Sequence, residues 1–91
     1  ITLGSLAKAL SITPHQLSEF LNERYQTNFR SFVNRYRIKE AERILVEEPD
    51  SSVLSIAFVI GFNSKTTFFR AFEKQTGMRP QEYRRLNMQK N

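Results

Sequence analysis

The stretch that decides the fold is IAFVIGFNSKTTFFRAFEKQTGMRPQEYR, residues 56–84. Apolar residues recur along it every three or four positions, which is the spacing of one face of an α-helix. Gly61 interrupts the pattern, and glycine readily takes the positive φ at which many helices end. Asn63 or Ser64 then supplies an N-cap for the next helix, which Gly77 ends. The stretch therefore predicts a helix, a short turn and a second helix.

The rest of the chain shows the same helical spacing, and no segment alternates for long enough to predict a strand. Thr13 and Asn28 stand where N-caps are expected, and Pro49 forces the helix that follows Asn28 to end near Glu47. Arg79 occupies the cap position of the last helix, where Ser, Thr or Asp would contribute about 1 kcal/mol. The chain is predicted to be all-α, with helices over about 3–10, 14–25, 28–47, 53–60, 65–76 and from Pro80 onward.

The two halves of the chain repeat one pattern. At an offset of 50, Leu6, Ala7 and Leu10 fall on Ile56, Ala57 and Ile60. At an offset of 51, the matched pairs are Leu17 with Phe68, Leu21 with Phe72, Phe29 with Pro80 and Phe32 with Tyr83. The second copy thus has a turn one residue longer, and each copy has an alanine where its two helices must cross closely, as in a helix-turn-helix. Two unrelated helical hairpins that happen to match are the alternative.

The predicted helix over 28–47 joins the two copies. Its roughly 20 residues would make a rod about 30 Å long at 1.5 Å per residue. Successive major grooves on one side of B-DNA lie about 34 Å apart. A rod of this length can hold two recognition helices about one turn of DNA apart. The sequence therefore predicts one 1–91 domain with two helix-turn-helix units, 1–33 and 52–91, joined by this linker helix.

Charge is divided unevenly along the chain. The net charge is +5, yet residues 1–50 hold seven basic and seven acidic residues. The excess belongs to residues 51–91, whose acidic residues are Glu73 and Glu82 and whose basic residues are Lys65, Arg70, Lys74, Arg79, Arg84, Arg85 and Lys90. A polyanion such as nucleic acid is expected to bind that half more strongly. A basic face that serves only solubility is the alternative.

Several classes of protein are made improbable by what the sequence lacks. It has no cysteine and one histidine, His15, so thiolate or paired-histidine metal sites and cysteine nucleophiles are excluded. No carboxylate pair, nucleophile or phosphate loop stands in a recognisable arrangement, so we expect no enzyme, no cofactor and no metal site. The longest apolar run, residues 56–60, is far too short to cross a membrane. The chain begins at Ile1 without a signal pattern, and we expect a cytoplasmic fragment of a longer protein.

These residues resemble a known family, the AraC/XylS transcription regulators, over essentially the whole chain. The second copy carries the resemblance through Ile56-Ala57, Gly61-Phe62, Ser64, Phe68, Arg70, Phe72, Gly77, Pro80 and Tyr83-Arg84. The first copy and linker carry it through Leu6-Ala7, Leu17-Ser18, Phe29, Phe32, Tyr36-Arg37-Ile38 and Ala41. The resemblance implies a seven-helix domain whose third and sixth helices enter adjacent major grooves of double-stranded DNA, with the first family helix missing here. It also implies a separate sensor or dimerisation domain elsewhere in the parent chain.

Carried over by position, the base-reading face of the second unit is Lys65, Thr66, Phe69 and Arg70. Arg70 is the leading candidate because its guanidinium can bind O6 and N7 of guanine, which discriminates by about 1–3 kcal/mol. A phosphate contact is the alternative for Arg70. The phenyl ring of Phe69 either contacts thymine methyl groups or packs against the last helix.

The corresponding face of the first unit is His15, Gln16, Ser18 and Glu19. It has no Lys or Arg, and Glu19 repels phosphate, so we expect this unit to read DNA weakly or narrowly; a merely solvated face is the alternative. Arg30, Arg35 and Arg43 on the linker are candidate phosphate contacts, and an ordinary solvated face is the alternative for all three. Arg37 and Arg84 are expected to form structural ion pairs. The remaining phosphate-contact candidates are Asn63, Ser64, Thr67 and Lys74.

The leading functional prediction is sequence-specific DNA binding for transcription control. The rival is a helical protein-interaction module that contacts RNA polymerase or a sensor domain through the neutral first half. The two differ in salt dependence, since phosphate contacts weaken steeply as salt rises and apolar docking does not.

Overall fold

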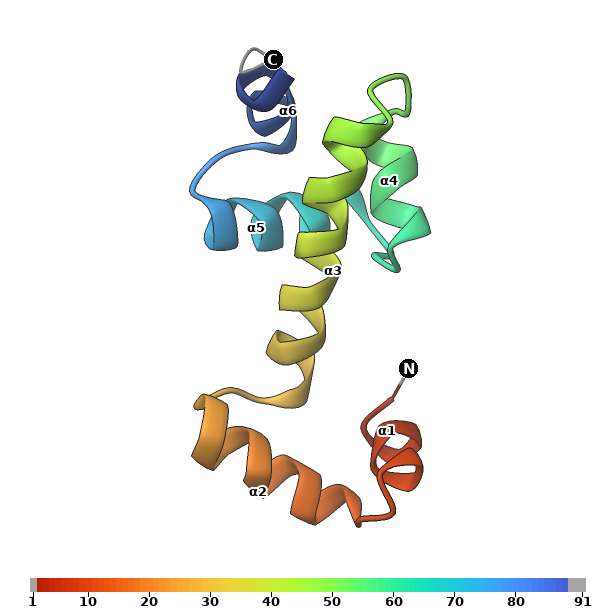
Figure 1. Ribbon diagram of the computed structural model, residues 1–91, viewed down its shortest axis with the longest axis vertical. Helices are drawn as coiled ribbons and strands as arrows, with labels where there is room; N and C mark the ends of the chain where they lie inside the picture. The colour runs from red at the N-terminus through yellow and green to blue at the C-terminus, as the bar shows by residue number, and fades with distance from the viewer. Residues whose placement is uncertain (1, 89–91) are drawn as a thin grey trace. The chain divides into compact units, whose positions relative to one another are not determined.

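The computed structural model describes residues 2–88, and the regular secondary structure of this part of the chain is all helix. Its helices are α1 (Leu3–Ala9), α2 (Pro14–Tyr25), α3 (Phe29–Glu47), α4 (Val53–Val59), α5 (Lys65–Thr76) and α6 (Pro80–Met88) (Figure 1). The all-α prediction is confirmed. None of the described helices combines the length and apolar character needed to cross a bilayer. The chain forms two compact units, unit 1 (Ile1–Val33) and unit 2 (Asn34–Asn91).

Short polar side chains begin the helices where the sequence predicted. Thr13 Oγ1 accepts from the backbone N–H of Gln16 at 3.1 Å, and Gln16 Oε1 accepts from the N–H of Thr13 at 2.9 Å. Asn28 Oδ1 accepts from the N–H of Ser31 at 2.8 Å and so caps α3. At α5 the sequence left two candidates, and Ser64 is the cap, with its Oγ 3.1 Å from the N–H of Thr67. These bonds satisfy N–H groups that helix geometry leaves without partners.

The turns of the two copies share one backbone pattern. The N–H of Ile12 donates to the carbonyl of Ala7 at 3.0 Å, and the N–H of Phe62 donates to the carbonyl of Ala57 at 2.9 Å. The residue before each donor has a positive φ, 59° at Ser11 and 107° at Gly61. Residues 10–13 separate α1 from α2, whereas residues 60–64 separate α4 from α5. The predicted repeat, including its longer second turn, is therefore confirmed at the level of individual hydrogen bonds.

Unit 1 has a small core built on Ala7, Leu17 and Leu21. Partly buried side chains from α1 and the start of α3 pack against it: Leu3, Leu6, Phe29 and Phe32. Phe20 and Tyr25 follow the helical spacing of Leu17 and Leu21, which predicts that they face inward with them, but they are 46% and 50% exposed. Two short helices and the start of α3 do not provide enough surface to cover the whole stripe. The Phe20 ring instead packs edge-on to Tyr25, with centroids 5.9 Å apart.

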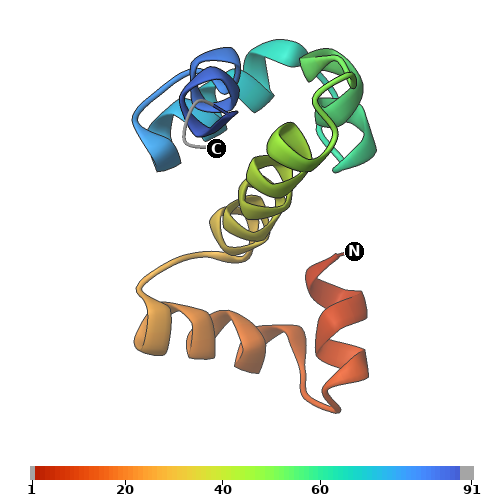
Figure 2. The same ribbon diagram turned by 45° about the horizontal axis from the view of Figure 1, so that its top comes forward.

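Unit 2 has the larger core, in which α4 and α6 lie on either side of the C-terminal half of α3 and α5 crosses it (Figures 1 and 2). Ala57 is fully buried, so α4 and α5 can approach closely. The buried cluster consists of Ile38, Ala41, Ile44, Leu45, Ile56, Ala57, Phe62, Phe68 and Phe72. Tyr83 attaches α6 to it, with its ring 5.5 Å from that of Phe72.

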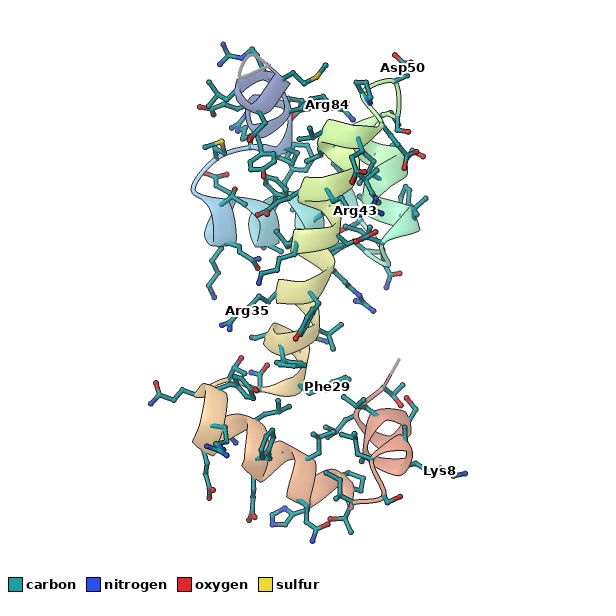
Figure 3. The ribbon with its side chains drawn as sticks, viewed as in Figure 1. Lys8, Phe29, Arg35, Arg43, Asp50 and Arg84 are labelled. Carbon is teal, nitrogen blue, oxygen red and sulfur yellow. The ribbon has the colours of Figure 1, made fainter. Side chains whose placement is uncertain are left out.

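Arg84 joins α6 to the end of α3. Figure 3 shows Arg84 between α6 and the end of α3. The Arg84 guanidinium donates to the backbone carbonyls of Leu45 at 2.8 Å, Ser51 at 2.7 Å and Glu48 at 3.3 Å. The predicted ion pair of Arg84 is therefore wrong, because its partners are carbonyl groups left free where α3 ends. Within the described residues Arg37 has no carboxylate partner either, and its guanidinium packs against Gly61.

Candidate nucleic-acid interface

The exposed face of α5 brings the four predicted base-reading residues of unit 2 together. Phe68 and Phe72 fix its inward face, because both are fully buried. The opposite side exposes Lys65, Thr66 and Arg70 and leaves Phe69 half-buried. A shallow hollow of about 460 Å³ is lined by Lys65, Thr66, Phe69, Arg70, Glu73 and Arg79. This face combines cationic donors with a hydroxyl and an aromatic edge, which are the groups that read base edges.

Phe69 has contacts on both sides. Its inner side packs against the core of unit 2, and its ring centroid lies 6.0 Å from that of Phe68. On its outer side the Nζ atom of Lys65 lies 5.3 Å from the ring centroid, within the range of a cation–π contact. Packing thus fixes the ring, while its remaining surface lines the hollow.

The phosphate-contact candidates of unit 2 lie at both ends of α5. Asn63, Thr67 and Lys74 are exposed. The hydroxyl of Ser64 is occupied, because it accepts from the N–H of Thr67 and donates to Thr67 Oγ1 at 2.8 Å. Ser64 therefore orders the start of α5, and its hydroxyl has little capacity left for a phosphate.

On α2 the predicted reading residues pair with one another. His15 Nε2 lies 2.9 Å from Glu19 Oε1, and both side chains are largely exposed. Gln16 is exposed, but its side-chain amide oxygen accepts a hydrogen bond in the helix cap. Ser18 is half-buried. This face therefore offers fewer free donors than α5 does.

Arg30, Arg35 and Arg43 all lie on α3 and are exposed. Figure 3 shows two of them, Arg35 and Arg43, along this helix. Arg43 differs from the other two in its partners. Its guanidinium bonds to Glu40 and lies 3.0 Å from Glu47 Oε2. These bonds lower the pKa of Glu40 and raise that of Arg43. Two carboxylates more than neutralise Arg43, which makes it a poor phosphate contact.

Sequence reasoning missed a second basic hollow beside the first, where α5 meets the start of α6. Its lining residues are Lys65, Phe69, Arg79, Gln81, Glu82 and Arg85. Two signals could have indicated it: the charge excess of residues 51–91, and an arginine at the cap position of the last helix.

The sequence and fold match known proteins. A family model described as a helix-turn-helix domain matches residues 6–86. The melibiose operon regulatory protein of Escherichia coli K12 is 29% identical over 90 residues, covering 99% of this chain and 30% of that protein. This chain therefore spans about 30% of that relative's length.

Solved structures agree with these matches. A DNA-binding transcriptional dual regulator from Escherichia coli K-12 superposes with a TM-score of 0.85 at 27% identity, covering 98% of this chain and 78% of that one. An AraC-type regulator from Chromobacterium violaceum gives a TM-score of 0.90 over 100% of this chain and 80% of the other; at 18% identity it shows the fold alone. The relatives are transcription regulators and not enzymes. The chain belongs to the AraC-type helix-turn-helix family, and it is a DNA-binding domain of a transcription regulator.

Proposed function

We propose that this chain is the sequence-specific DNA-binding part of a longer bacterial regulator, which places α2 and α5 in successive major grooves. The observation that carries the proposal is the exposed face of α5, where Arg70, Thr66 and Lys65 surround the edge of Phe69. The repeated turns support a second recognition helix in unit 1. The 19 residues of α3 correspond to about 28 Å, close to the groove repeat of about 34 Å.

On α5 we assign base reading to Arg70, with Thr66, Lys65 and Phe69 beside it. One helical turn separates Arg70 from Thr66, so both can face one groove. Arg70 suits guanine and the exposed edge of Phe69 suits a thymine methyl group. Asn63, Thr67 and Lys74 are assigned to the backbone phosphates that flank this groove, and Ser64 orders the start of the helix that carries them.

On α2 we assign His15, Gln16, Ser18 and Glu19 to the second groove, with weaker or narrower reading. The contact between His15 and Glu19 supports this difference, because it occupies the one carboxylate that could accept from cytosine. Arg30 and Arg35 of α3 supply phosphate contacts there.

The parent protein is proposed to act in the cytoplasm, where bacterial DNA lies. Its remaining length would hold a sensor or dimerisation domain, since the melibiose regulator is more than three times as long as the matched part. RNA polymerase is a second proposed partner, reached once the domain is docked on its DNA site.

Arg70→Ala tests the base-reading assignment. We expect discrimination at one base pair of the selected site to fall by about 5- to 150-fold, because a bidentate arginine–guanine contact is worth about 1–3 kcal/mol. Sites selected from random oligonucleotides would first be identified with the unaltered chain, and affinities for all single-base variants would then be measured. Arg43→Ala is the matched control, since it removes the same charge from a side chain already held by Glu40 and Glu47. Unchanged discrimination in Arg70→Ala contradicts the assignment.

Salt dependence separates DNA binding from protein docking. With Arg30, Arg35 and Lys74 on phosphates, log K is expected to fall with log salt at a slope of at least about 2.7 in magnitude, which is at least about 40-fold between 50 and 200 mM salt. Fluorescence anisotropy with a labelled duplex gives this slope directly. An affinity that barely responds to salt favours the protein-interaction module.

A further inference from the structure

The hollow at the start of α6 adjoins the reading face of α5 without being part of it. The two hollows share Lys65, Phe69 and Arg79. The second extends across Gln81 and Glu82 to Arg85 and has a volume of about 510 Å³. Arg79, Gln81 and Arg85 are exposed, and all of these residues belong to unit 2. The second hollow therefore continues the reading face of α5 onto the start of α6.

The second hollow carries a net positive charge. Lys65, Arg79 and Arg85 line it against the single carboxylate of Glu82. Lys65 is held over the ring of Phe69, which places its ammonium group at the border between the two hollows. Guanidinium groups present paired donors that match phosphate oxygens, so the hollow suits an anionic phosphate better than a base edge.

Arg79 occupies the N-cap position of α6, where its side chain cannot stabilise the start of the helix. Ser, Thr, Asp or Asn at a cap position accepts from the first N–H groups, but arginine has no acceptor atom. A residue that lowers the stability of its own helix is expected mainly at a functional site. The side chain of Arg79 instead lines both hollows.

We propose that this hollow, here called the α6 hollow, binds the sugar-phosphate backbone of the DNA strand beside the groove that α5 reads. Arg79 and Arg85 would each bind a phosphate oxygen of that strand. The inference rests on the proposed function, because the two hollows share Lys65, Phe69 and Arg79 and so form one continuous surface for DNA. In this proposal α6 contributes to the affinity for DNA but does not contact the bases.

Arg79→Ala and Arg85→Ala test this assignment in the full chain. Each is expected to weaken binding about 5- to 10-fold near 0.1 M salt, equally for the selected site and for unrelated duplex DNA. Each lost phosphate contact also reduces the magnitude of the salt slope by about 0.9. Arg43→Ala serves again as control, because it lowers the net charge by the same amount outside the α6 hollow. Variants of Arg79 and Arg85 whose slopes match that of the control overturn the inference.

Arg79→Ser separates a binding role from a structural one. Serine restores a cap, so the midpoint of thermal unfolding should rise by about 4–8 °C while DNA affinity falls as in Arg79→Ala. Affinity equal to that of the unaltered chain overturns the role of Arg79. Glu82→Gln should tighten binding, since it removes the one carboxylate of the hollow.

The two proposals fail in different ways. If the unaltered chain binds duplex DNA and Arg70→Ala changes its discrimination, the proposed function stands whatever the α6 variants do. If the unaltered chain does not bind duplex DNA, the proposed function fails and the inference fails with it.

Discussion

Phe68→Ala is expected to destabilise unit 2 by about 3–5 kcal/mol, the usual effect of removing a buried phenyl ring. Phe68 is fully buried, and its ring lies 5.4 Å from that of Phe62 and 5.7 Å from that of Phe72. Folded domains are stable by only about 5–15 kcal/mol, so the variant should be largely unfolded on mild heating. Because Phe68 fixes which face of α5 points inward, loss of DNA binding should accompany the loss of structure.

Phe58→Ala is the matched control for Phe68→Ala. Phe58 lies on α4 and is 52% exposed, so the same chemical change should alter the free energy of unfolding by less than about 1 kcal/mol. Urea unfolding followed by circular dichroism gives both values. Equal losses in the two variants would show that Phe68 is not the centre of this core.

Arg84→Met should destabilise unit 2 by about 2–4 kcal/mol. The guanidinium donates to three backbone carbonyls, and each charged hydrogen bond contributes about 1.5–3 kcal/mol before the desolvation of both partners is counted. Methionine keeps the aliphatic length of the side chain but leaves the carbonyls of Leu45 and Ser51 without their donor. We expect a lower urea midpoint and faster hydrogen exchange at the end of α3.

Arg85→Met provides the comparison on the next residue. Arg85 is exposed on α6, so its replacement should leave the free energy of unfolding nearly unchanged while weakening DNA binding. Arg84→Lys should recover only part of the loss, because an ammonium group lacks the planar fork that reaches several carbonyls. If Arg84→Met is as stable as Arg85→Met, Arg84 does not fasten α6 to α3.

Helix boundaries were predictable because their causes are local. Thr13 and Asn28 cap the helices that the sequence assigned to them, and Gly77 ends α5 with a φ of 81°. A cap and a left-handed terminal residue depend on neighbours within a few positions, which one sequence displays directly. The repeat was equally visible, since Ala7 and Ala57 mark the same helix crossing in each copy.

Long-range contacts were not predictable in the same way. The carbonyls that Arg84 binds lie 33 to 39 residues earlier in the chain, and no periodic pattern links them to it. Tyr25 and Phe20 fit an inward stripe by spacing, but burial also depends on which surfaces are available to cover them. The α6 hollow was missed for the same reason, because Arg79 and Lys65 meet only after α5 and α6 pack.

The two turns differ in how freely they can mutate. Ser11 takes a φ of 59°, inside the small left-handed region that ordinary residues can enter at modest cost, so several residue types could replace it. Gly61 takes a φ of 107°, and a Cβ there would lie 3.1 Å from Nε of Arg37. Since no other residue adopts that conformation easily, the first turn tolerates substitution whereas the second turn requires its glycine.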